Sequence, residues 1–209
     1  MDQMDKAAMF GFLPAETAHE PDGRKDRSKQ SQQRIVKAML ELVAAGNMEP
    51  SADQIAVAAR VGRRSVFRHF EDMDTLYREM TDRLEATMGS VILRKFEAVD
   101  WRGKVLELVD RRAGAFEALM PFMRAGQVHR HRSPFLKASH VRFVGLLRQI
   151  LLGIMPGEMA RDTAMVEAID LLLSFESWNR LREDQGLDIE AAKNVLKQAV
   201  APLLERASR

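Results

Sequence analysis

Hydrophobic residues recur along most of the chain at intervals of three and four, which is the period of an amphipathic α-helix. The first such stripe contains Ile35, Met39 and Val43, lies within a predicted helix from about Ser31 to Ala45, and ends at Gly46. No segment shows the sustained alternation of β-branched and polar residues that is typical of a strand. The pattern therefore predicts an all-α protein with about nine helices.

A second, short helix is predicted to begin at Ser51. Ser51 and Gln54 match the Ser-x-x-Gln capping box, in which each residue satisfies a backbone amide of the other at the start of a helix. This helix is expected to end near Arg60. Its buried face is expected to comprise Ile55, Ala58 and Ala59.

A third helix is predicted after a turn at Val61 and Gly62. It is expected to turn its arginines outward, at positions 63, 64 and 68. A short helix, a turn of three or four residues and a short basic helix together predict a helix-turn-helix. The residues expected to be buried by the third helix are Val66, Phe67 and Phe70.

Three regions are expected along the chain. Residues 1–29 are polar, contain Pro14 and Pro21, and predict a flexible arm. Residues 30–78 are expected to form the helix-turn-helix domain, and residues 79–209 a separate helical domain, whose expected roles are given below. Beyond the helix-turn-helix, long amphipathic helices are predicted at 74–98, 101–119, 121–131, 135–153, 158–182 and 188–205.

Composition narrows the class of protein. A chain of 209 residues that is 46% hydrophobic can bury its own core. The absence of cysteine excludes disulfides, thiolate metal sites and a cysteine nucleophile, and it favours a reducing cytoplasm. The longest apolar run, 150–155, is far shorter than the roughly 20 residues of a membrane helix. We expect a cytoplasmic protein that binds no membrane and needs no cofactor.

Charge is concentrated in one part of the chain. The net charge is only +2, but residues 24–68 carry ten basic and four acidic side chains, whereas residues 69–209 carry equal numbers of each. A local excess of positive charge on a neutral body favours a partner with dense negative charge, either nucleic acid or an anionic membrane surface.

The sequence between residues 35 and 77 combines several features in one register: Ile and Ala in the first helix, Ile-Ala in the second, then aromatic-x-His-Phe and acidic-x-Leu. In this respect it resembles the N-terminal DNA-binding domain of the TetR/AcrR family of bacterial transcriptional regulators. The resemblance implies a ligand-responsive repressor that binds a palindromic operator as a homodimer. The matching residues are Ile35, Ala38, Ile55, Ala56, Ala59, Val61, Phe67, His69, Phe70, Asp74 and Leu76.

Four positions depart from the family pattern. The turn glycine is Arg60 here, which predicts strain in the turn, and the helix-capping serine is Gly62. The phosphate-binding tyrosine is Phe67, and the lysine that opens the next helix is Met73. Two usual contacts with the DNA backbone are therefore missing, and the arginines of the third helix are expected to replace the lost charge.

The arginines that begin the third helix, Arg63 and Arg64, are expected to read base edges in the major groove, as residues at this place do in helix-turn-helix proteins. Ser65 and His69 are expected to contact phosphate, and Arg68 is expected to contact either a base edge or a phosphate. The alternative is a solvated face that pairs with the acidic residues 71, 72 and 74. The expected DNA-binding residues are Lys29, Arg34, Ser51, Arg63, Arg64, Ser65, Phe67, Arg68 and His69.

The body contains many of the chain's 13 methionines among its aromatic residues. Such an interior adapts to small apolar ligands, although a methionine-rich core explains the same composition. The candidate ligand-pocket residues are Phe116, Met120, Met123, His140, Phe143 and Trp178.

The last two predicted helices carry apolar stripes. The resemblance implies that these helices form a four-helix dimer interface, whereas stripes of this kind usually pack within their own domain. The candidate interface residues are Val166, Ile169, Leu173, Ile189, Leu196 and Leu203.

The run His129–Arg132, with His140, suggests a metal site. Histidines two apart point to opposite sides of a helix, and this run ends a predicted helix, where positive charge is favoured. We therefore expect a solvent-facing helix end and no metal.

Two other functions compete with a sequence-specific regulator. A protein that compacts DNA or adheres to membranes needs only the basic segment. An enzyme is disfavoured because no phosphate loop, zinc-protease or nucleophile-elbow motif is present.

Overall fold

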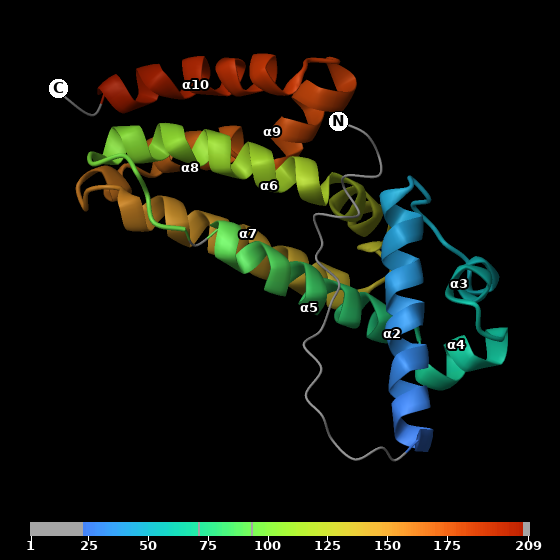
Figure 1. Ribbon diagram of the computed structural model, residues 1–209. Helices are drawn as coiled ribbons and strands as arrows, with labels where there is room; N and C mark the ends of the chain where they lie inside the picture. Colours follow the sequence, from blue (N-terminus) through green and yellow to red (C-terminus); the bar gives the residue numbers. More distant parts are fainter. Residues whose placement is uncertain (1–22, 71, 93, 207–209) are drawn as a thin grey trace. The chain divides into compact units, whose positions relative to one another are not determined.

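The computed structural model describes residues 23–70, 72–92 and 94–206, and Figure 1 traces their helices. Within these ranges the regular elements are α-helices, one 3₁₀ turn and one π-helical turn, and no strand occurs. This confirms the all-α class. The chain divides into two compact units, the first made of residues up to 87 together with 121–137, and the second of 88–120 together with 138–209. Residues 1–22 of the predicted arm lie outside the described part.

The first unit contains the predicted helix-turn-helix. Its helices are α2 (Gly23–Ala44), α3 (Ala52–Ala59) and α4 (Arg63–His69), followed by most of α5 (Met73–Ile92) and the last turns of α6 (Trp101–His129). Both α3 and α4 pack against α2 and against each other (Figure 1). The short helix, turn and short basic helix predicted from the sequence are therefore present.

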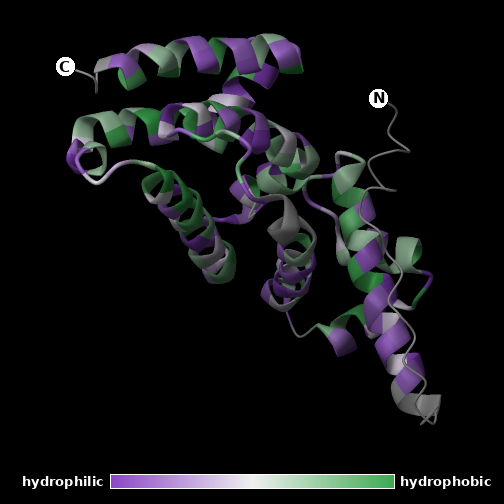
Figure 2. Ribbon diagram, turned by 60° about the vertical axis from the view of Figure 1, so that its left-hand side comes forward, coloured by the Kyte–Doolittle hydropathy of each residue, from purple (hydrophilic) through white to green (hydrophobic). Residues whose placement is uncertain are grey.

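Helix α2 begins at Gly23, not near Ser31 as predicted. The residues that precede Ser31 are strongly polar, as the purple turns of α2 in Figure 2 show, but they include no proline after Pro21. Asp26 lies in the first turn, where a negative charge complements the helix dipole, and the Ser31 hydroxyl donates to the Arg27 carbonyl at 2.9 Å. The polar residues 23–29, which were predicted to belong to the flexible arm, are therefore part of α2, because polarity by itself does not interrupt a helix.

The capping box at the start of α3 is confirmed. Gln54 donates its backbone amide to the Ser51 hydroxyl at 3.2 Å, and the Gln54 side-chain oxygen accepts from the Ser51 amide at 2.9 Å. At the other end of α3, Arg60 adopts the left-handed conformation, with φ 53° and ψ 47°. The strain predicted for an arginine in place of glycine is therefore built into the turn. Helix α4 follows Gly62, which provides no side-chain cap.

Two expectations about burial in the helix-turn-helix are wrong. Phe67 is 52% exposed and Ala58 is also exposed. In α4 the side chains of Val66 and Phe70 are four residues apart and share the buried face, which leaves Phe67 about 100° around the helix from Val66. In α3 the buried residues are Ile55, Ala56 and Ala59.

The first unit has one core to which the end of α6 contributes. Ala125 of α6 is buried with the α2, α3 and α4 side chains, and Phe122 packs against the same cluster. His129 forms a 2.9 Å hydrogen bond through Nε2 with the Met48 carbonyl, and its ring lies 5.5 Å from that of Tyr77. His129 is therefore not the solvent-facing residue that was expected, although His131 and Arg132 are exposed.

The second unit contains the remaining helices. They are the first part of α6, most of α7 (Pro134–Ile154), a 3₁₀ turn (Met159–Arg161), α8 (Thr163–Leu172), α9 (Phe175–Asn179), a π-helical turn (Arg180–Asp184) and α10 (Ile189–Arg206). Toward the end of the chain, α8 contacts both α9 and α10.

Two predicted helix boundaries differ from the structure. Helix α6 continues through Pro121, although a proline inside a helix removes one backbone hydrogen bond and its ring crowds the carbonyl four residues earlier. The buried side chains of Phe116 and Ala125, one on each side of Pro121, offset this cost. The single helix predicted over 158–182 is instead divided. Asp162 caps α8 by accepting from the Met165 amide, and Ser174 caps α9 by accepting from the Ser177 amide.

A buried arginine joins three helices of the second unit. Arg112 of α6 donates to the Leu173 carbonyl at 2.9 Å and to the Leu147 carbonyl at 2.6 Å, and its Nη1 lies 3.7 Å from Asp170 Oδ1. Burial lowers the Arg112 pKa to about 10, while Asp170 opposes that shift. The break between α8 and α9 frees the Leu173 carbonyl, and Arg112 provides its partner.

Candidate nucleic-acid interface

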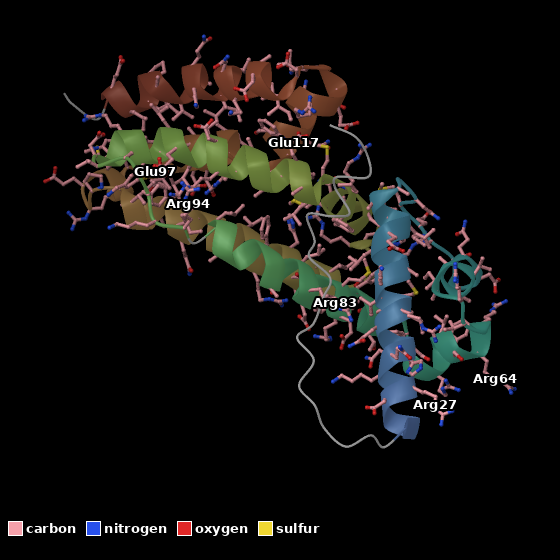
Figure 3. All side chains as sticks on the ribbon, viewed as in Figure 1. Arg27, Arg64, Arg83, Arg94, Glu97 and Glu117 are labelled. Atoms are coloured by element: carbon pink, nitrogen blue, oxygen red, sulfur yellow. The ribbon has the colours of Figure 1, made fainter. Side chains whose placement is uncertain are left out.

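Helix α4 presents its arginines to solvent, as predicted. Arg63, Arg64 and Arg68 are all exposed, and Figure 3 shows Arg64 pointing away from the helix. Helix α4 is anchored by the buried side chains of Val66 and Phe70. One face of this short helix is therefore fixed in the core, while the opposite face carries positive charge.

Arg63 is restrained by contacts that the sequence did not reveal. Its Nη1 lies 3.2 Å from Asp53 Oδ2, in the first turn of α3, and its Cζ lies 5.7 Å from the centroid of the Phe67 ring, one turn further along α4. Asp53 was not among the predicted interface residues. Its position ten residues before Arg63 follows no helical period, so only the packing of α3 against α4 brings the two side chains together.

The predicted phosphate contacts in α4 differ in accessibility. The Ser65 hydroxyl is half-buried and accepts from Arg68 Nη2 at 3.4 Å, while its own hydrogen remains to be donated. His69 is half-buried, and its buried Nε2 has no hydrogen-bond partner. Burial, and secondarily the charge of Arg68, lower the His69 pKa below its usual 6.5. The imidazole is therefore neutral at pH 7.

The candidate residues outside α4 also belong to the first unit. Lys29 and Arg34 are exposed on α2, and Arg34 donates to the Ser31 hydroxyl at 3.3 Å. The Ser51 hydroxyl is exposed but already accepts the Gln54 amide in the capping box. Its contact with DNA remains a prediction, as do the contacts of Lys29 and Arg34.

The candidate pocket residues do not lie in one unit. Met123 belongs to the first unit and the other five to the second. Phe116 and Trp178 are almost completely buried, Phe116 packs edge-on against Phe175 at 5.6 Å, and Trp178 donates to Glu117 at 3.0 Å. These two side chains fill the core of the second unit. Met120, His140 and Phe143 are half-buried, and the ligand role of all six stays a prediction.

A cavity of about 720 Å³ lies elsewhere in the second unit. It is bounded by the segment that precedes α6, by Lys104 of α6 and by the last turns of α7. The lining combines apolar side chains with three basic ones and the acidic Glu97, and it includes Arg94, Lys95, Phe96, Lys104, Ile150 and Ile154. The Arg94 side chain also pairs with Glu97. Both residues are labelled in Figure 3. None of the candidate pocket residues lines this cavity.

Most of the candidate dimer residues are buried inside the second unit itself. Val166, Ile169, Leu173 and Leu196 are 5% exposed or less, because α8 packs against α10. Ile189 is 36% exposed and Leu203 half-buried. The apolar surface that α8 and α10 leave open instead includes Leu171, at 66%, and Val195, at 42%.

The described residues contain neither a cluster of metal ligands nor a membrane-spanning helix. No three His, Asp or Glu side chains there lie close enough together to hold a metal ion. No helix in the same part of the chain has the length and hydrophobicity needed to cross a membrane.

The chain was compared with protein families, curated proteins and solved structures. No family model and no curated protein matches it. A transcriptional regulator from Rhodococcus sp. Rha1 has a similar structure, with a TM-score of 0.61 and 14% identity over 85% of this chain and 96% of that one. A TetR-like transcriptional regulator from the same organism has a TM-score of 0.53 and 16% identity over 90% and 99% of the two chains. The resemblance found in the sequence is therefore confirmed in the fold, which this chain shares with a solved TetR-like transcriptional regulator.

Proposed function

We propose that the protein is a transcriptional regulator, most simply a repressor, that binds double-stranded DNA through α4. The observation that carries this proposal is the helix-turn-helix geometry, in which Val66 and Phe70 fix α4 in the core while Arg63, Arg64 and Arg68 face solvent. An arginine in the major groove can donate two hydrogen bonds to guanine O6 and N7. The concentration of basic residues between 24 and 68 supports the same partner.

We further propose that it binds a palindromic operator as a homodimer. The exposed apolar side chains Leu171 of α8 and Val195 of α10 support an interface on these two helices, since such residues bury favourably against a second copy. Leu171→Glu should shift the protein toward monomer in sedimentation, while Val141→Glu on α7, which is 64% exposed, serves as the control. Equal sedimentation of both variants and the wild type as dimers would place the interface elsewhere.

The same proposal includes a small-molecule effector that binds the second unit. The cavity lined by Lys95 and Lys104 together with apolar side chains supports an amphipathic anion as effector, whereas the third basic side chain, Arg94, is already paired with Glu97. Decanoate and decanol share the same alkyl chain length and differ in charge, so comparing them separates the contribution of the carboxylate from that of the apolar part of the ligand. Decanoate should bind more tightly, and Lys104→Gln should reduce that difference. No binding of either compound would remove this cavity from the proposal.

DNA binding is tested by selecting duplexes from a random library with the full-length protein. Arg63→Ala and Arg64→Ala should each lower affinity for the selected duplex by about 1 to 3 kcal/mol and change affinity for scrambled DNA much less. Arg132→Ala, which removes another exposed arginine of the same unit outside the helix-turn-helix, should have little effect. A protein that only compacts DNA would select no sequence and lose affinity for both duplexes alike.

A further inference from the structure

Arg63 and Arg64 are neighbours at the start of α4, but they differ in their surroundings. The Arg63 guanidinium lies between a carboxylate from α3 and the exposed ring of Phe67, as described above. Arg64 extends from the helix into solvent (Figure 3). Two arginines of similar position and charge therefore enter any DNA complex with different degrees of preorganisation.

The contact with Asp53 involves one specific part of the guanidinium. The carboxylate accepts from Nη1, the nitrogen on the Cδ side. The Nε and Nη2 hydrogens form the opposite edge of the planar group, where they lie parallel. That edge matches the spacing of guanine O6 and N7, so an arginine held through Nη1 can still donate two hydrogen bonds to the base.

We propose that Asp53 is a positioning residue for base recognition by Arg63. This inference rests on the proposed DNA-binding function and adds a determinant of specificity that lies outside the recognition helix. Asp53 limits the orientations of a long side chain before DNA arrives, so that less conformational entropy is lost when Arg63 contacts guanine. The ring of Phe67 restricts the same guanidinium from a second direction.

The negative charge of Asp53 has a second effect, on DNA that lacks the preferred base. Both members of the pair are 64% exposed, so the pair itself adds little to folding stability. A carboxylate at the interface repels phosphate, and Asp53 also neutralises Arg63 as a general phosphate contact. Asp53 therefore lowers affinity for random DNA while it helps Arg63 on the correct sequence.

The test uses Asp53→Asn in the full-length protein, which keeps the size of the side chain and removes its charge. We expect affinity for the selected duplex to fall roughly two- to tenfold, the range associated with ordering one long side chain. Affinity for scrambled duplex should rise. The control is Glu41→Gln on α2, which removes an equal charge from another exposed ion pair of the same unit and should leave the ratio of the two affinities unchanged.

A second measurement separates positioning from a general charge effect. Duplexes substituted at single base pairs identify the position whose preference disappears in Arg63→Ala and the position whose preference disappears in Arg64→Ala. Asp53→Asn should weaken the preference at the Arg63 position alone, and adding it to Arg63→Ala should cause no further loss of specificity.

The outcomes distinguish this inference from the function on which it rests. If the wild type selects no sequence, the DNA-reading function itself is refuted. If the wild type selects a sequence but Asp53→Asn strengthens binding to both duplexes equally, the regulator stands and the positioning role is refuted. Loss of preference at the Arg64 position to the same extent would also contradict the inference.

Discussion

The turn between α3 and α4 contains a removable source of instability. Arg60 has φ 53°, in the left-handed region, where a residue with a Cβ atom loses roughly 1 to 2 kcal/mol relative to glycine. Glycine gains more entropy in the unfolded chain, which offsets about 0.5 to 1 kcal/mol. The Arg60 side chain is exposed, and its backbone amide donates to the carbonyls of Ala56 and Val57 whatever the side chain. Arg60→Gly should therefore stabilise this unit by about 0.5 to 1 kcal/mol.

The effect is local, so hydrogen exchange of the amides in α3 and α4 is the appropriate assay in a protein with two units. Protection of these amides should rise about two- to fivefold in Arg60→Gly, as the free energy change implies. Arg60→Ala keeps the Cβ atom and should leave protection almost unchanged. Ala58→Gly, at an exposed helical position of α3, should lower protection. Equal protection in Arg60→Gly and Arg60→Ala would refute the assignment of strain to the Cβ atom.

Three further predictions concern ionisable groups. Asp170→Asn should destabilise the second unit by about 3 to 5 kcal/mol in denaturant unfolding, because it leaves the buried charge of Arg112 without its counter-ion; a loss below 1 kcal/mol would show that the carbonyl contacts suffice. Because the His69 pKa is lowered in the folded state, its contribution to the free energy of unfolding should be fully present above pH 6.5 and should be lost as the pH falls below that value. His69→Gln should flatten this pH dependence. Burial raises the pKa of Tyr77 to about 12. The absorbance of this single tyrosine should therefore show little ionisation at pH 10.5 in the native protein, whereas in denaturant the tyrosine should ionise near pH 10. Because the unfolded chain loses this proton first, the free energy of unfolding should decline as the pH rises above 10.

Features set by neighbouring residues were predictable from the sequence. The capping box of Ser51 and Gln54 depends on residues three apart, and the strain at Arg60 depends on one backbone position. The outward face of α4 follows from the spacing of Val66 and Phe70. In each case the physical cause lies within one turn of helix.

Features set by tertiary packing were not predictable in the same way. Periodicity identified Ile169 and Leu196 as buried but did not distinguish burial within the unit from burial against a second copy. The pairing of Asp53 with Arg63 requires the packing of α3 on α4. The divided helix near Ser174 is stabilised by a carbonyl contact from Arg112, which is 61 residues away from Leu173 in the chain.

The contribution of α6 to the first unit has a consequence for how this chain folds during synthesis. Ala125 and Phe122 belong to the same core as the helix-turn-helix, although 33 residues of the second unit, 88–120, separate them from it. When residue 87 leaves the ribosome, the apolar surface that these side chains cover is still open to water and to chaperones. Helices α3 and α4 therefore reach their final stability only after residue 137 has emerged, when residues 88–120 of the second unit have been synthesised but residues 138–209 have not.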